Sequence, residues 1–110
     1  MSDSSFYKEV AKLTEKDLGT SSGEILPALS GGIDREFIKT RLSGVIDHML
    51  DNEFEKLCNT FYRLDVSEAA FHHVLESTPK EKISGELADL VIDREIMKVR
   101  TRQLYRDNKL

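Results

Sequence analysis

The sequence predicts an all-α fold: a small helical bundle of about four helices, with a long second helix and a long last helix. Apolar residues recur at three- and four-residue spacing along most of the 110 residues, and no stretch of useful length alternates as a strand does. Charged residues make up 33% and hydrophobic residues 39%, which is the balance of a folded chain rather than a disordered one. At this length we expect residues 1–110 to form a single helical domain.

The first half of the chain contains one clear helix, a linker and a longer helical stretch. Apolar spacing predicts a helix over residues 5–18. Residues 19–32 hold four of the six glycines and one of the two prolines, so they are expected to form a Ser/Gly-rich linker. The apolar face then slips in phase near Asp51 and Asn52. Because no Pro or Gly forces a break there, we favour one long, bent helix over 34–63, and two shorter helices are the alternative.

A short helix is expected next, over residues 66–77. Asp65 can accept from the first free backbone N–H groups of this helix, and Glu68 can reach back to complete a capping box. Thr78 and Pro79 repeat the pattern for the last helix, because a proline in the first turn loses no hydrogen bond.

The last helix is expected over residues 79–105, followed by a frayed C-terminus at 106–110. It carries two apolar stripes on sides about 120 to 180 degrees apart. The first stripe is Ile83, Leu87, Leu90 and Val91, and the second stripe is Ala88, Ile92, Ile96 and Val99.

The second stripe is the predicted interface. The other helices of the chain are expected to cover the first stripe, which leaves Ala88, Ile92, Ile96 and Val99 for a second copy of the chain or another helical protein. If this stripe is core instead, changing Ile92 and Ile96 to Glu unfolds the protein rather than giving a folded monomer.

A basic row follows the same helix. Arg94, Lys98, Arg102 and Arg106 are spaced by four, which places them along one side. The chain as a whole has a net charge of -4, so nucleic acid is the less favoured partner for this row. We expect it to meet acidic groups, on a partner or on the chain itself, or to complement the helix dipole. The acidic groups considered within the chain are Asp47, Asp51, Glu53 and Glu55.

Candidate chemistry is sparse. His72 has Glu68 and Glu76 four residues to either side, an arrangement that suits a metal or a proton-transfer cluster, but a solvated helix face is favoured. Cys58 is expected to be a buried thiol that packs as a small hydrophobe. We therefore assign no catalytic, metal-binding or cofactor-binding residue. A small metal-binding or enzymatic bundle remains the second alternative.

The location expected from the sequence is the cytoplasm. The single cysteine cannot form an internal disulfide, and no apolar run approaches the ~20 residues of a membrane span, so no membrane contact is expected. The chain also begins without the basic and apolar regions of a secretion signal.

Two segments carry a resemblance. The run Tyr62-Arg63-Leu64-Asp65-Val66-Ser67-Glu68, then a short helix, then Leu90-Val91-Ile92-Asp93-Arg94-Glu95, resembles a pattern in small helical bacterial proteins of unassigned function. It covers about half the chain. The resemblance implies a cytoplasmic bacterial protein and transfers no active-site residue. The two stripes favour a non-enzymatic interaction or structural module that forms a homodimer through its last helix, with a nucleic-acid-associated regulatory protein that uses the basic row as the alternative.

Overall fold

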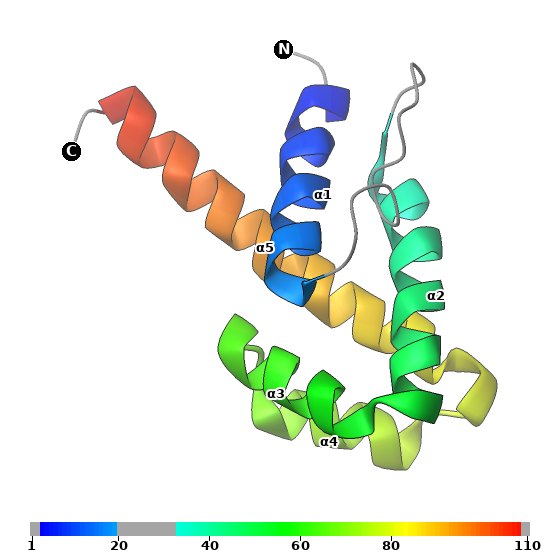
Figure 1. Cartoon of the computed structure of the whole chain (residues 1–110). Coiled ribbons are helices and arrows are strands. Elements are labelled where there is room, and N and C mark those ends of the chain that lie inside the picture. The colour runs from blue at the N-terminus through cyan, green and yellow to red at the C-terminus, as the bar shows by residue number, and fades with distance from the viewer. Residues whose placement is uncertain (1–2, 20–32, 109–110) are drawn as a thin grey trace.

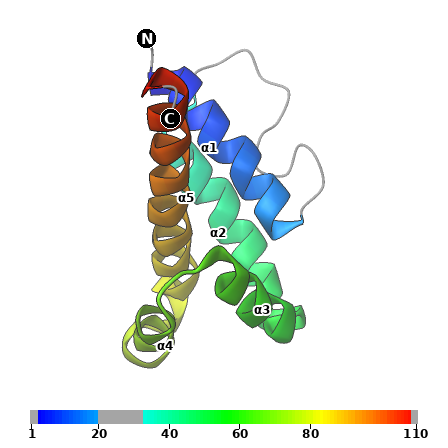
Figure 2. The same cartoon turned by 90° about the vertical axis from the view of Figure 1, so that its left-hand side faces the viewer.

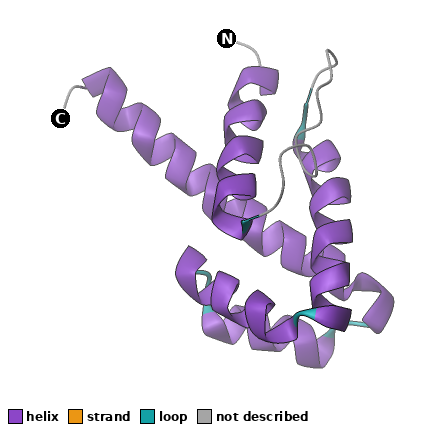
Figure 3. Cartoon of the chain, viewed as in Figure 1, coloured by secondary structure: helices purple, strands orange, loops and turns teal. Residues whose placement is uncertain are grey.

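The computed structural model describes residues 3–19 and 33–108, and every regular element in that part of the chain is helical (Figures 1 and 3). This confirms the predicted all-α fold with a long last helix. The elements are α1 (Asp3–Leu18), α2 (Arg35–Asn52), α3 (Phe54–Leu64), α4 (Glu68–Ser77), the single 3-10 turn η1 (Lys80–Lys82) and α5 (Ile83–Asn108).

Helix α5 is the longest helix of the described chain and the one on which the others pack. Each of the other helices and the turn η1 contacts it. Helices α1 and α2 lie along α5, while α3 and α4 form a pair at the end of the molecule that lies away from both termini (Figures 1 and 2). A helix in this position must bury side chains on most of its circumference, which explains why its sequence is apolar on two sides.

The second stripe is core, which corrects its expected role as an interface. Ala88, Ile92 and Val99 are fully buried within the chain, as are Leu87 and Val91 of the first stripe. Ile96 is partly buried against the same core. The reason is that every other described element packs on α5, with α2 making the most extensive contact, so the chain itself covers both stripes.

The long helix expected over 34–63 is two helices, so the alternative is correct. Helix α2 ends at Asn52, and Glu53, with φ -142° and ψ 49°, leaves the helical conformation before α3 begins at Phe54. The buried side of α2 ends at Met49, and the buried side of α3 begins at Leu57. The phase slip in the sequence therefore marks a turn that lets both helices face the core.

The start of α4 lies two residues later than expected. Ser67, not Asp65, caps it, because the Ser67 hydroxyl accepts from the Ala70 N–H at 3.2 Å. Asp65 instead closes α3 in a left-handed conformation, φ 62° and ψ 36°, with its N–H directed at the carbonyls of Phe61 and Tyr62. The expected capping box at Asp65 is thus wrong.

The boundaries of the last helix also differ from those expected. Thr78 closes α4, and Pro79 precedes η1, so one 3-10 turn stands where the first turn of the last helix was predicted. Helix α5 continues to Asn108, beyond the expected fraying after Tyr105. The predicted linker lies outside the described residues except for Gly19, whose φ of 68° favours glycine at the end of α1.

Candidate functional site

Three of the four residues of the basic row bind acidic groups of the chain itself. Lys98 Nζ lies 3.2 Å from Asp17 Oδ2 on α1, and Arg106 Nη2 lies 3.3 Å from Glu9 Oε1. Arg94 donates through Nε to the carbonyl of Leu64 at 3.1 Å and lies 3.7 Å from the Asp65 carboxylate. The row therefore anchors α5 to α1 and to the α3–α4 turn. Arg102 is exposed and has no ion pair among the described residues.

The acidic groups named from the sequence are elsewhere. Asp47, Asp51, Glu53 and Glu55 are exposed around the junction of α2 and α3, and we call them, together with Phe54, the acidic corner. Within the described part of the chain none of these four carboxylates forms an ion pair, so docking of the basic row on them is contradicted. Phe54, in their midst, is 47% exposed, which is unusual for a phenylalanine beside a well-packed core.

The C-terminal half of α5 carries a second exposed apolar feature. Met97, Leu104 and Tyr105 are 61%, 57% and 56% exposed, and we call them the C-terminal strip. Met97 and Leu104 are seven residues apart and so lie on nearly the same side of the helix. The sequence contains this seven-residue spacing, but sequence reasoning considered only the two longer apolar stripes of the same helix and did not identify Met97 and Leu104.

Two arginines flank the C-terminal strip. Arg100 places its guanidinium 5.7 Å from the centre of the Phe6 ring and forms no ion pair among the described residues. Arg102 is likewise unpaired. This half of α5 is therefore an apolar strip bordered by unneutralised positive charge.

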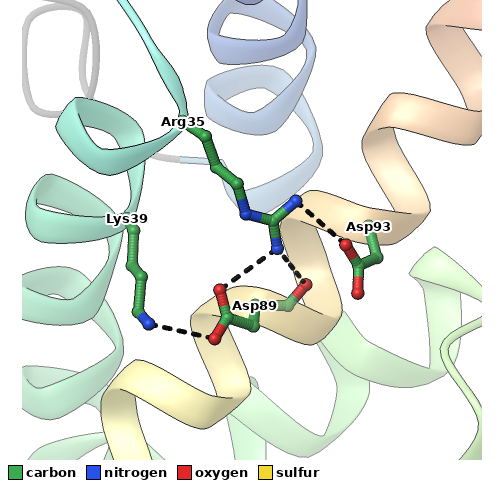
Figure 4. A network of polar contacts seen from close by, with 4 residues as sticks. All are labelled: Arg35, Lys39, Asp89 and Asp93. Atoms are coloured by element: carbon green, nitrogen blue, oxygen red, sulfur yellow. Dashed lines mark hydrogen bonds and ion pairs between the residues drawn. The ribbon is translucent and has the colours of Figure 1, made fainter.

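A polar network joins α2 to α5 at the other half of the helix (Figure 4). Asp89 accepts from Arg35 Nη2 at 3.1 Å and from Lys39 Nζ at 3.0 Å, and Arg35 Nη1 also lies 3.0 Å from Asp93. The hydrogen bond from Lys39 to Asp89 raises the pKa of the lysine. Sequence reasoning missed this network, because acidic and basic residues at helical spacing are ordinary on solvated surfaces.

One carboxyl group lies inside the core. Glu95 of α5 is 0% exposed, and neither of its oxygens has a hydrogen-bond partner in the described chain. Its nearest cation is Lys98, whose Nζ lies 3.4 Å from Oε1. Burial raises the pKa of Glu95 to about 7; the nearby Asp17 carboxylate adds to the increase, and Lys98 opposes it.

The candidate metal ligands on α4 are exposed to solvent. His72, Glu68 and Glu76 are all exposed on α4. Among the described residues, no group of three or more His, Cys, Asp or Glu side chains is arranged to hold a metal ion. The row on α4 therefore has the arrangement of the favoured alternative, a solvated helix face.

Cys58 packs against the core as a small hydrophobe, as expected, but it is half-buried rather than buried. It lines an open groove of about 780 Å³ between α3 and α4. The aromatic rings in this groove belong to Phe61, Tyr62 and Phe71, and His72 lies at the same groove. Periodicity could not predict that Cys58 and His72 line the same groove, because they belong to different helices.

These features define the class of the protein: an all-α chain whose last helix contacts every other described element, with exposed large apolar side chains on α3 and on the C-terminal half of α5. No protein-family model, curated protein or solved structure matches the chain. In the described part of the chain, no helix has both the length and the apolar character needed to cross a membrane.

Proposed function

We propose that this chain is a non-enzymatic interaction module that self-associates through its last helix. The C-terminal strip of one copy docks on the acidic corner of another copy. The observation that carries the proposal is the exposure of three large apolar side chains, Met97, Leu104 and Tyr105, each more than half exposed on one half of one helix.

Exposed apolar surface supplies the driving force. Removing such surface from water contributes about 25 cal/mol per Å², and clustered exposed hydrophobic residues on a folded protein are typical of contact sites. Met and Tyr are also among the residues enriched at interfaces. Phe54 offers a matching apolar contact in the acidic corner.

Charge complementarity favours a second copy as the occupant. The C-terminal strip is bordered by Arg100 and Arg102, and the acidic corner carries four carboxylates, and all of these charges are free of ion pairs within the described chain. Opposite charges on two facing surfaces steer association and fix the register. The C-terminal strip and the acidic corner are thus complementary both in their apolar side chains and in their charges.

The two surfaces cannot meet within one molecule. Figures 1 and 2 place the C-terminal end of α5 and the junction of α2 and α3 at opposite ends of the molecule. Two antiparallel copies can make the contact twice, which closes the assembly as a two-fold homodimer.

The nucleic-acid alternative has less support. Arg94, Lys98 and Arg106 already pair with carboxylates of the chain, and phosphate binding requires free cations. The acidic corner would also repel a polyanion. A metal-binding or enzymatic bundle has no clustered ligand set to support it among the residues that the structure describes.

Oligomeric state tests the proposal. Light scattering after size exclusion, over a concentration series, is expected to give the mass of a dimer for the wild type. Arg102→Glu and Leu104→Glu are each expected to weaken the dimer by roughly tenfold or more, because each removes one attractive contact and adds a charge that the carboxylates repel. Lys12→Glu is the control: it makes the same change of charge at an exposed residue of α1, and its dimer is expected to match the wild type.

A charge reversal identifies the acceptor surface. Asp51→Arg alone is expected to weaken the dimer, and Asp51→Arg combined with Arg102→Glu in one chain is expected to restore it, since each contact then contains one new opposite pair. If the double variant dimerises no more tightly than the single variants, the acidic corner is not the surface on which the C-terminal strip docks. A monomeric wild type that binds duplex or single-stranded nucleic acid at low salt, and loses this binding in Arg102→Glu, would favour the alternative.

A further inference from the structure

We propose that α1 is a pH-sensitive cover of the C-terminal half of α5, which is held in place while Glu95 is protonated and loosened when Glu95 ionises. This device is separate from the proposed self-association, because Glu95 is fully buried whereas the surfaces of that contact are exposed.

The surroundings of Glu95 supply too few positive charges and hydrogen-bond donors to stabilise a buried carboxylate. Lys98 Nζ lies 3.4 Å from Glu95 Oε1 and 3.2 Å from Asp17 Oδ2, so one ammonium group serves two carboxyl groups from two helices. With Glu95 protonated, the lysine and the aspartate balance each other. With Glu95 ionised, the site holds one uncompensated negative charge that has no hydrogen-bond donor of its own.

Among residues 3–19 and 33–108, no other element brings a second cation to Glu95. The two half-buried cations of α2, Arg35 and Lys39, are bound to Asp89 and Asp93. On α5 itself, Arg94 is directed at Leu64 and Asp65. Apart from Cys58, every ionisable side chain of α3, α4 and η1 is exposed. Asp17 and Lys98 are therefore the charged groups that decide the state of Glu95.

The proton on Glu95 is lost near neutrality. The pKa of Glu95 is raised to about 7, chiefly by burial; Asp17 contributes to the rise and Lys98 opposes it. The pKa of a solvated Glu is ~4.3, so a state in which water reaches Glu95 binds its proton far more weakly. Rising pH therefore favours the opened state over the closed one.

Helix α1 is the element that opening would move. It supplies Asp17, the second carboxyl of the site, and it lies along the C-terminal half of α5, where Glu9 pairs with Arg106. Val10, Leu13 and Leu18 of α1 are buried in the shared core, so closed α1 stays the major form and ionisation shifts a population.

Amide hydrogen exchange followed from pH 5 to pH 8.5 tests the proposal, with rates corrected for the intrinsic effect of pH. The opening equilibrium of α1 is expected to rise roughly 40-fold between pH 5 and pH 7 and then to level off, as linkage requires for a pKa of about 7 in the closed state and about 4.5 in the open state. Amides of α4, which is packed on the other half of α5, serve as the internal reference and are expected to change much less.

Glu95→Gln is the decisive variant, because it keeps the shape of the side chain and removes the titration. Its α1 amides are expected to show no pH dependence beyond the intrinsic one, whereas the control Glu81→Gln, at an exposed carboxylate of η1, is expected to behave as the wild type. Asp17→Asn provides an independent check: it removes the competing carboxylate and is expected to move the transition to lower pH.

Three results would overturn the proposal. The first is a flat wild-type profile for α1. The second is a pH dependence of α1 that persists in Glu95→Gln. If that variant does not fold, the equivalent result is a midpoint that Asp17→Asn does not change. The third is equal loss of protection in α1 and α4, because this would show unfolding of the whole chain rather than release of one helix.

Discussion

At the scale of single residues, Glu95 is the group whose surroundings suit its neutral form and not its charged form. A fully buried carboxylate without hydrogen bonds is one of the few side-chain states that can cost a domain several kcal/mol. Among the described residues, the only cation close to Glu95 is Lys98, which also serves Asp17, so the charged form of Glu95 is poorly compensated. The carboxyl group acts through the proton it holds.

The stability of the protein is expected to depend on this proton. The pKa of Glu95 is raised from 4.5 to about 7, so its contribution is full below pH 4.5 and is lost as the pH rises toward 7. Glu95→Gln should therefore raise the free energy of unfolding at pH 8 by up to about 3 kcal/mol and change it little at pH 4.5. Urea denaturation at the two pH values measures this. Equal effects at both would show that packing, and not ionisation, is responsible.

The sequence did not reveal this role. Glu95 stands in a run of charged residues, Asp93-Arg94-Glu95, where a solvated face is the ordinary expectation. Its burial depends on how α1 packs across α5, and residues about eighty positions apart decide this contact. Helical periodicity within α5 places Glu95 between the two stripes, but the charged side chain itself gives no sign of burial.

At the scale of the elements, α2 and α5 are joined by both apolar and polar contacts. The two carboxylates of the polar network differ: Asp89 is bound by two cations, while Asp93 is bound by one and its side chain is 66% exposed. The register between the two helices should therefore depend mainly on Asp89.

Asp89→Asn is expected to lower the free energy of unfolding by about 1–2 kcal/mol, because it weakens two charge-assisted hydrogen bonds at a partly buried site. Asp93→Asn is the matched control on the same helix and should cost less than half as much, since exposed ion pairs contribute little. Thermal or urea denaturation of the two variants gives the comparison. A larger loss from Asp93→Asn would contradict the importance assigned to Asp89.

The second stripe leads to a further prediction for α5. Ile92→Glu places a carboxylate at a fully buried position, and together with Ile96→Glu it is expected to unfold the chain rather than to yield a folded monomer. Circular dichroism distinguishes the two outcomes. A double variant that keeps its helical signal and a cooperative melting transition would show that this stripe is not part of the core.

At the scale of the whole molecule, the periodicity of the sequence predicted the fold class and most helix positions. It also gave the two stripes of the last helix. It could not say what covers each stripe, because that depends on whether residues 34–63 are straight or turn at Glu53. Since they turn, the chain supplies enough separate helices to surround α5. Ala88, Ile92 and Val99, predicted to form an interface, therefore lie in the core.

The basic row shows the same limit. Its spacing predicted a continuous row and contact with acidic groups, but its acidic partners, Asp17, Glu9 and Asp65, come from segments far along the chain. What remains exposed is smaller: the C-terminal strip with Arg100 and Arg102, and the acidic corner around Phe54. The proposed association rests on these remaining surfaces.

Sedimentation equilibrium of the untagged wild type at neutral pH and moderate salt, compared with Leu104→Glu, tests the central claim most directly. We expect the wild type to approach twice the 12.6 kDa of one chain as concentration rises, and the variant to remain at the mass of one chain with its helical content unchanged. A wild type that stays at the mass of one chain at the highest concentration, or a variant that associates as the wild type does, would contradict self-association through the last helix.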